Sequence, residues 1–233
     1  DLMFDISPAE WTAILLSLRV AVIATLVATP FGIALAWLLA RHDFWGKSVL
    51  DALVHLPLVL PPVVTGYLLL LTFGRRGMVG AWLADNFGIV FAFRWTGAAL
   101  ACGVMSFPLL VRPIRLSIEA IDRRLEQAAS TLGAAPWRVF ATVTLPLALP
   151  GILAGMVLGF AKAIGEFGAT ITFVSNIPGE TQTISSAIYS LIQTPDGDTA
   201  AARLVLISIV IAMGALIASE AFARRATKRL HGN

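Results

Sequence analysis

The chain has 233 residues, of which 58% are hydrophobic and only 13% are charged, and its formal net charge at pH 7 is +3. Soluble globular domains carry about 25% charged residues, so this composition and a mean hydropathy of +0.83 exclude a soluble globular protein. The basic balance does not indicate nucleic-acid binding, because Lys and Arg gather in the cytoplasmic loops of membrane proteins. No internal repeat or linker is visible, so we expect one membrane domain over residues 1–233.

Five segments satisfy the requirement for a membrane-spanning helix, which is about 20 mainly apolar residues. They are Thr12–Ala40, Val49–Phe73, Trp95–Val111, Val139–Ile164 and Leu204–Ala223. The sequence therefore predicts an all-α integral membrane protein with about five transmembrane helices.

The distribution of Lys and Arg predicts the orientation of these helices. When the loop between the third and fourth spans is placed in the cytoplasm, eleven of the 17 basic residues lie on the cytoplasmic side. They are Arg41, Lys47, Arg112, Arg115, Arg123, Arg124, Arg138, Arg224, Arg225, Lys228 and Arg229. The outer Arg75–Arg76 pair is unfavourable, but the reverse topology fits much worse. We therefore expect the N-terminus outside and the C-terminus inside.

The second span contains three prolines, Pro57, Pro61 and Pro62, followed by Gly66. Each proline removes a backbone donor and can clash with the preceding turn, so the helix should not run undisturbed. Broken helices expose polar backbone near the bilayer midplane in transport proteins. Pro61, Pro62 and Gly66 are therefore candidates for lining a translocation pathway. A structural kink without substrate contact is an equally good interpretation.

The loop between the third and fourth spans carries a helical pattern of apolar residues. These residues recur in steps of four and three, as on a single helix face; they are Ile114, Ile118, Ile121, Leu125, Ala128 and Leu132. Gly133 should end this helix in a left-handed turn, and Pro136 can begin a second short helix. A helix lying on the headgroups would be richer in Lys and Arg. The near-balanced charge favours a cytoplasmic helix that docks on another protein.

The fourth span ends near Lys162 and Glu166, which are four residues apart and can pair on one helix face. A helix-end pair is the main interpretation, and a substrate contact is the alternative. The connection from Gly165 to Arg203 is too long for a turn, and a short helix is expected at Ser185–Ile192. Irregular backbone at membrane depth requires surrounding protein or a watery cavity. We therefore expect this connection to cap or gate a pathway.

Within this connection, Glu166, Phe167 and Thr170 are the candidate pathway residues. Catalytic and metal sites are not predicted, because the three histidines are scattered without ligand spacing. No G-x-x-x-x-G-K-[ST] phosphate loop occurs either, so we expect no nucleotide to bind this chain.

The segment Glu126–Gly133, followed after nine residues by Val143–Pro146, resembles the EAA loop of the permease subunits of ABC importers. In that pattern Glu-Ala-Ala is followed by three residues, Gly, nine residues and Ile-x-Leu-Pro. Gln127 stands in the Glu position and Val143 in the Ile position. The resemblance implies that this loop docks in a groove of a cytoplasmic ATPase subunit. The coupling residues it implies are Glu126, Gln127, Ala128, Ala129, Gly133, Leu145 and Pro146.

Three further segments, residues 55–63, 165–181 and 188–193, resemble bacterial molybdate permeases. Sulfate and thiosulfate permeases share Gly165–Ala169 and are the closest alternative. The resemblance implies a non-catalytic permease in the bacterial inner membrane that imports molybdate or tungstate by alternating access. Its partners would be a second permease copy, two ABC ATPase subunits and a periplasmic oxyanion-binding protein, with no nucleic acid. ATP and Mg would bind the ATPase, and this chain would bind no cofactor.

An autonomous ion-coupled carrier is a less favoured interpretation of the residues themselves. Such carriers place several ionisable residues inside their spans and often contain inverted repeats. The spans of this chain are nearly free of charge and no repeat is apparent.

Overall fold

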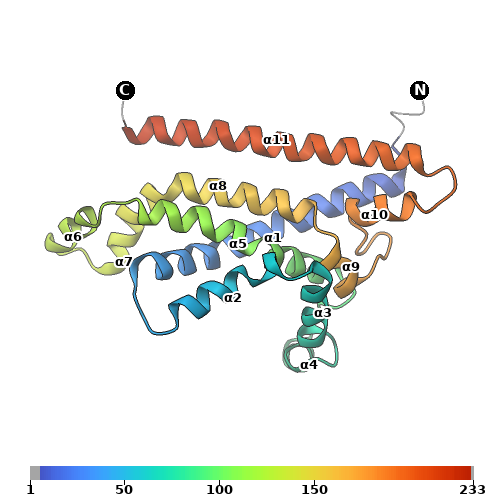
Figure 1. Ribbon diagram of the computed structural model, residues 1–233, viewed down its shortest axis with the longest axis horizontal. Helices are drawn as coiled ribbons and strands as arrows, with labels where there is room; N and C mark the ends of the chain where they lie inside the picture. The colour runs from blue at the N-terminus through green and yellow to red at the C-terminus, as the bar shows by residue number, and fades with distance from the viewer. Residues whose placement is uncertain (1–5, 232–233) are drawn as a thin grey trace.

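The computed structural model describes residues 6–231, with side chains described as far as residue 221 except residue 219. Within these residues every regular element is helical (Figure 1). The elements are α1 (Pro8–Arg41), α2 (Lys47–Val59), α3 (Pro62–Phe73), α4 (Met78–Phe87), α5 (Trp95–Glu119), α6 (Arg123–Thr131), α7 (Pro136–Val139), the π-helical turn η1 (Phe140–Thr144), α8 (Leu145–Ile164), α9 (Gly168–Val174), α10 (Ile184–Leu191) and α11 (Asp198–His231).

Among residues 6–231, four helices are long and apolar enough to cross a membrane. They are α1, α5, the continuous helix Pro136–Ile164 formed by α7, η1 and α8, and residues 198–218 of α11. The second predicted span is instead the pair α2 and α3, which are bent by 115° at the break. If this pair counts as one span, the five predicted spans are confirmed. The break follows Leu60, whose successors Pro61 and Pro62 cannot continue a helix, whereas Pro57 lies inside α2.

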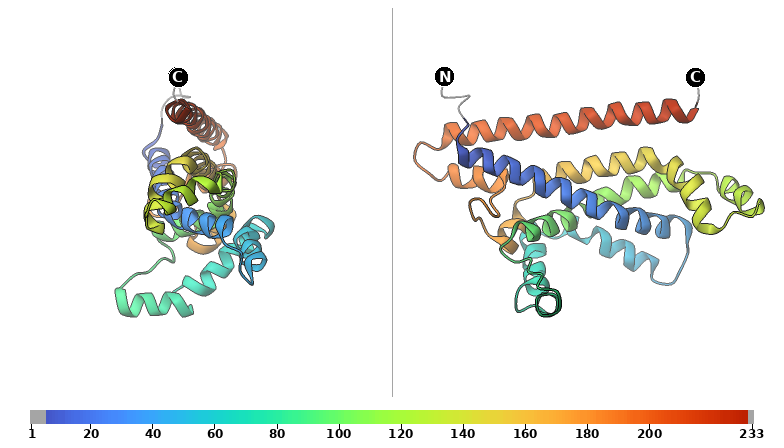
Figure 2. Two further views of the ribbon diagram at one scale, coloured as in Figure 1. Left: turned by 90° about the vertical axis from the view of Figure 1, so that its left-hand side faces the viewer. Right: turned by 180° about the vertical axis from the view of Figure 1, so that it is seen from behind.

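The long helices form an elongated bundle whose two ends differ (Figures 1 and 2). α1 and α11 begin at the end occupied by α9 and α10, and α11 ends on the side of α6 and α7. The start of α1 and the end of α11 thus lie at opposite ends of the bundle, as expected when successive spans alternate in direction. Asp1 and Asp5, which the sequence places on the outer side, lie outside the described residues. The side chains of Arg224, Arg225, Lys228 and Arg229, counted above as cytoplasmic, also lie outside the described part.

The close contact between α5 and α8 depends on two glycines spaced by four residues, Gly151 and Gly155. A Cβ atom added to Gly155 would lie 2.5 Å from the carbonyl oxygen of Leu110, and one on Gly151 would lie 2.3 Å from Cβ of Ser117. Small residues at such spacing let the backbones of two membrane helices approach closely. α5 is thereby packed between α8 and α1 in the centre of the bundle.

A buried ion pair joins the beginnings of α1 and α11. Ser7 and Glu10 form a capping box at the start of α1, and Glu10 also accepts hydrogen bonds from Arg203 Nε at 2.9 Å and Nη2 at 3.1 Å. Both side chains are largely buried. The pair therefore fixes α1 and α11 to each other at one end of the bundle.

The stripe from Ile114 to Leu132 does not form the single helix that the sequence predicts. α5 continues to Glu119, and α6 is a separate helix of nine residues. The chain breaks between them because the carboxylate of Asp122 accepts a hydrogen bond from the backbone N–H of Arg124 and starts a new helix. Ile114 and Ile118 consequently lie buried in the bundle as part of the third span, which is longer than predicted.

Candidate coupling loop and translocation pathway

The helix α6 lies at one end of the bundle and buries none of its residues. The side chain of Leu125 is 51% exposed, and in the following loop and helix those of Leu132 and Trp137 are 89% and 67% exposed. α6 also carries several charged residues, so lipid is a poor partner for these apolar side chains. These side chains are therefore free to contact another protein, as the sequence leads us to expect.

Gly133 has a backbone φ of +88°, a conformation that residues with a Cβ atom rarely adopt. A Cβ atom there would meet nothing within 4 Å, so the requirement for glycine comes from the backbone alone. The left-handed turn predicted after the loop helix is therefore confirmed. The second short helix also begins at Pro136 as predicted, but it continues through η1 into α8. Gln127 and Ala128 are exposed, and Ala129 is half-buried.

Glu126 differs from its neighbours on α6 because its carboxylate points toward the bundle. It pairs with Arg41 of α1, with 3.0 Å between Arg41 Nε and Glu126 Oε2. Its Oε1 accepts a hydrogen bond of 2.5 Å from the hydroxyl of Thr144 in η1. Leu145 packs against the buried cluster at this end, and Pro146 is exposed in the first turn of α8. The loop motif thus contains both inward-facing and outward-facing residues.

The structure brings the two groups of pathway candidates together where α3 crosses α9. A Cβ atom on Gly66 would lie 2.5 Å from the carbonyl oxygen of Ala169, and one on Gly168 would lie 2.7 Å from Cβ of Pro62. The break at Pro61 directs α3 away from the axis of α2 and onto α9. The two segments are far apart in the sequence and share one contact region.

Glu166 is only 2% exposed and both of its carboxylate oxygens are engaged. Oε2 accepts a hydrogen bond of 2.6 Å from Lys162 Nζ, and Oε1 accepts one of 3.0 Å from the backbone N–H of Ala169. The helix-end pair predicted from the spacing is therefore confirmed. The carboxylate lies at the N-terminus of α9, where negative charge is favourable. Glu166 fixes α9 relative to α8.

Phe167 and Thr170 flank this carboxylate in the chain. The ring of Phe167 is half-buried and lies 5.0 Å from the ring of Tyr189. Thr170 is buried and its hydroxyl donates to the carbonyl oxygen of Phe167 at 2.8 Å. Both side chains therefore support the local shape of the segment around α9.

Thr65, next to Gly66 on α3, is a polar residue that sequence reasoning did not single out. Its side chain is buried, and among the described side chains its hydroxyl oxygen has no hydrogen-bond partner. A buried hydroxyl without a partner is uncommon and calls for an explanation. Nothing in the local sequence distinguishes Thr65 from the other threonines, because its burial depends on the packing of α3.

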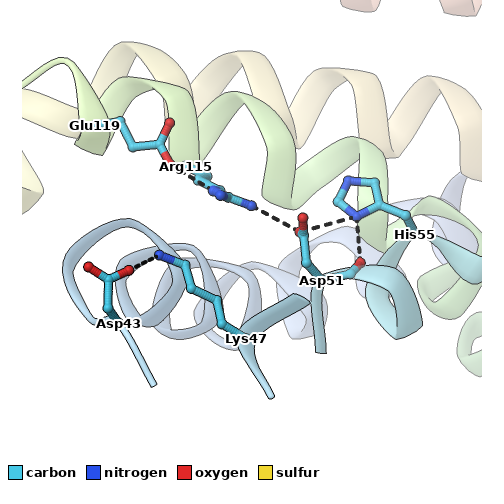
Figure 3. A network of polar contacts seen from close by, with 6 residues as sticks. All are labelled: Asp43, Lys47, Asp51, His55, Arg115 and Glu119. Carbon is cyan, nitrogen blue, oxygen red and sulfur yellow. Dashed lines mark hydrogen bonds and ion pairs between the residues drawn. The ribbon is translucent and has the colours of Figure 1, made fainter. Parts of the chain in front are cut away.

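The α2 half of the broken span is held to α5 by charged groups (Figure 3). Arg115 Nη1 lies 2.9 Å from Asp51 Oδ1, and Arg115 Nε lies 2.8 Å from Glu119 Oε1. His55 Nδ1 lies 2.8 Å from the backbone oxygen of Asp51. Val54 is the one buried residue of α2. The Asp51–Arg115 pair therefore adds a polar attachment to the apolar packing of Val54.

A bundle of long apolar helices that includes a helix pair broken at its prolines is an architecture found in membrane transport proteins. Over residues 28–228 the sequence matches the family described as "Binding-protein-dependent transport system inner membrane component". The chain belongs to this family and is a multi-pass inner-membrane protein.

Two relatives and one solved structure illustrate the similarity. The "Molybdenum transport system permease protein ModB" of Escherichia coli (strain K12) is 64% identical over 220 residues, which cover 94% of this chain and 96% of that protein. The "Sulfate transport system permease protein CysT" of the same organism is 36% identical and covers 91% of this chain and 75% of that protein. A bacterial ABC transporter involved in the import of alginate has a TM-score of 0.74 at 21% identity, covering 96% of this chain and 82% of that chain. The structural likeness shows the same fold.

Proposed function

We propose that this chain is the membrane-spanning permease subunit of an ATP-driven importer of molybdate or tungstate. The observation that carries the proposal is the 64% identity, over 94% of the chain, to a molybdenum transport system permease. The sulfate permease relative is 36% identical, so a sulfate or thiosulfate importer is the alternative. Residues 1–233 would form one permease domain.

The assembly would contain two copies of this chain, two cytoplasmic ABC ATPase subunits and a periplasmic oxyanion-binding protein. The N-terminus would lie outside and the C-terminus inside, with α6 in the cytoplasm. This orientation is supported by the eleven basic residues that it places on the cytoplasmic side. The permease itself would be non-catalytic, since ATP and Mg²⁺ would bind the ATPase subunits.

The docking role of α6 is supported by its exposure and by the apolar side chains of Leu125 and Leu132. Gln127, Ala128 and Ala129 would contact a groove of the ATPase, and Gly133 would permit the sharp exit of the chain. Closure of the ATPase subunits on ATP would move the docked helices as rigid bodies and rotate the permease pair outward. Hydrolysis would return the pair to the inward-facing state.

The pathway would pass the region where α3 meets α9. Pro61, Pro62 and Gly66 would present backbone groups on one side, while Phe167 and Thr170 would shape the other. Glu166 would contribute by positioning α9, because its two oxygens already have partners. The hydroxyl of Thr65 has no partner but is buried in this conformation, so it would meet an oxyanion only when α3 and α9 move apart. Few and transient contacts suit passage better than a tight site.

The test is uptake by the complete complex, reconstituted in proteoliposomes with its ATPase subunits and binding protein. We expect ATP-dependent uptake of labelled molybdate that tungstate competes for and sulfate does not. Uptake of sulfate in preference to molybdate would support the alternative importer. Uptake that persists without ATP would instead support the autonomous carrier and contradict the proposal.

A further inference from the structure

We propose that Arg41 and Thr144 are positioning residues that transmit the movement of α6 to α1 and α8. The inference rests on the proposed function and adds a transmission role for Arg41, which lies outside the loop motif, and for Thr144, which fills the variable position of Ile-x-Leu-Pro. Both residues contact the inward-facing carboxylate of Glu126. We call the three side chains together the elbow cluster.

Arg41 is the last residue of α1 and contacts α6 at one point and the break before α6 at another. Its Nε lies 3.0 Å from Glu126 Oε2, and its Nη2 donates to the backbone oxygen of Ile121 at 3.2 Å. The side chains of Arg41 and Glu126 are 9% and 17% exposed. Ile121 lies in the break between α5 and α6. The guanidinium therefore holds both the start of the loop and its helix, and its planar geometry fixes their direction.

Thr144 supplies the second attachment from the other side of the loop. Its side chain is 1% exposed, and its hydroxyl donates to Glu126 Oε1. Thr144 lies at the end of the π-helical turn, in which the N–H of Leu145 bonds to the oxygen of Phe140, five residues earlier. π-helical turns are rare and frequently lie at functional sites. This one lies where the membrane helix of α8 meets the loop.

The elbow cluster is the main polar connection of α6 to the bundle, because α6 buries no residue of its own. A weaker contact of 3.5 Å joins Arg123 Nη2 to the backbone oxygen of Ala40. The rings of Trp37 on α1 and Phe140 in η1 are 5.7 Å apart and join the two membrane helices at the same level. Hydrogen bonds to a shielded carboxylate are directional and strong. A displacement of α6 therefore moves the ends of α1 and α8 together.

The test compares Thr144→Val with Thr142→Val in the complete reconstituted complex. Both changes remove one hydroxyl from the same helical turn, but Thr142 is exposed and bonds only within its own helix, to the oxygen of Arg138. The measured quantity is the number of molybdate ions taken up per ATP hydrolysed, together with co-purification of the ATPase subunits. Thr144→Val should lower this ratio about tenfold, as expected for a lost hydrogen bond to a charged group. Thr142→Val and Thr144→Ser should keep the ratio of the unmodified protein, and all three variants should retain the ATPase.

Equal ratios for Thr144→Val and Thr142→Val would overturn the inference. Loss of the ATPase from Thr144→Val would also overturn it, because the cluster would then form the docking surface itself. If Thr144→Val does not accumulate, Arg41→Lys is the second test, because lysine keeps the charge but cannot span both contacts; an unchanged ratio there overturns the inference. An unmodified complex that takes up no molybdate would instead refute the proposed function.

Discussion

The contact between α3 and α9 predicts a clear effect for Gly66→Ala. The added methyl group would lie 2.5 Å and 2.9 Å from the oxygen and Cα of Ala169, and 2.9 Å from Cβ of Thr172. To restore an ordinary separation of about 3.5 Å, the helices must move apart by about 1 Å. Overpacking of this kind costs about 2–3 kcal/mol where backbone atoms are involved. The better helix propensity of alanine offsets about 1 kcal/mol of this cost.

The expected net destabilisation is therefore about 1–2 kcal/mol, which should lower the apparent Tm in detergent by roughly 2–8 °C. Gly214→Ala on α11 is the matched control, because a Cβ atom there meets no atom within 4 Å. Uptake by Gly66→Ala should fall by more than the loss of folded protein explains, since the displaced helices carry the proposed pathway. The same Tm and the same uptake for Gly66→Ala and Gly214→Ala would show that α3 and α9 do not pack as closely as described.

Three further predictions concern ion pairs. Lys162→Met should lower the yield of folded protein, measured by size-exclusion chromatography in detergent, because it leaves Glu166 buried without its counter-charge. Adding Glu166→Gln should restore most of the yield, and a double variant with no higher yield would contradict this explanation. Asp51→Asn should free α2 from Arg115 at a cost of at most about 1 kcal/mol, because the pair is partly exposed, and should increase protease cleavage in the loop before α2. Glu10→Gln should lower stability by about 2–3 kcal/mol by weakening the bond to its arginine partner on α11; a Tm unchanged within error would count against that pair.

The spans could be predicted from the sequence because a bilayer imposes a length and a composition that few soluble helices satisfy. The positions of the break at Pro61 and of the turn at Gly133 were also predictable, since proline and glycine act on the local backbone. The pairing of Lys162 with Glu166 followed from their spacing. The glycines at 151, 155 and 159 are a further signal in the sequence, because small residues spaced by four favour close helix packing.

Other features depend on contacts between distant segments and could not be predicted. The stripe from Ile114 to Leu132 keeps helical spacing across the break at Asp122, so periodicity alone could not separate α5 from α6. The prolines locate the break but not its angle of 115°, because α3 also packs on α9, which is distant in the sequence. The inward direction of Glu126 is determined by Arg41, 85 positions away in the chain. The helix α4 in the connection before α5 was not anticipated either.

The central claim is that α6 docks in the cytoplasm on a separate ATPase. Gln127→Cys tests it directly, because residue 127 is exposed on α6 and the natural Cys102 is buried and should not react. A membrane-impermeant maleimide should label this cysteine in inverted vesicles but not in intact cells, and bound ATPase subunits should block the labelling. Labelling in intact cells, or labelling that the ATPase subunits leave unchanged, would contradict the account.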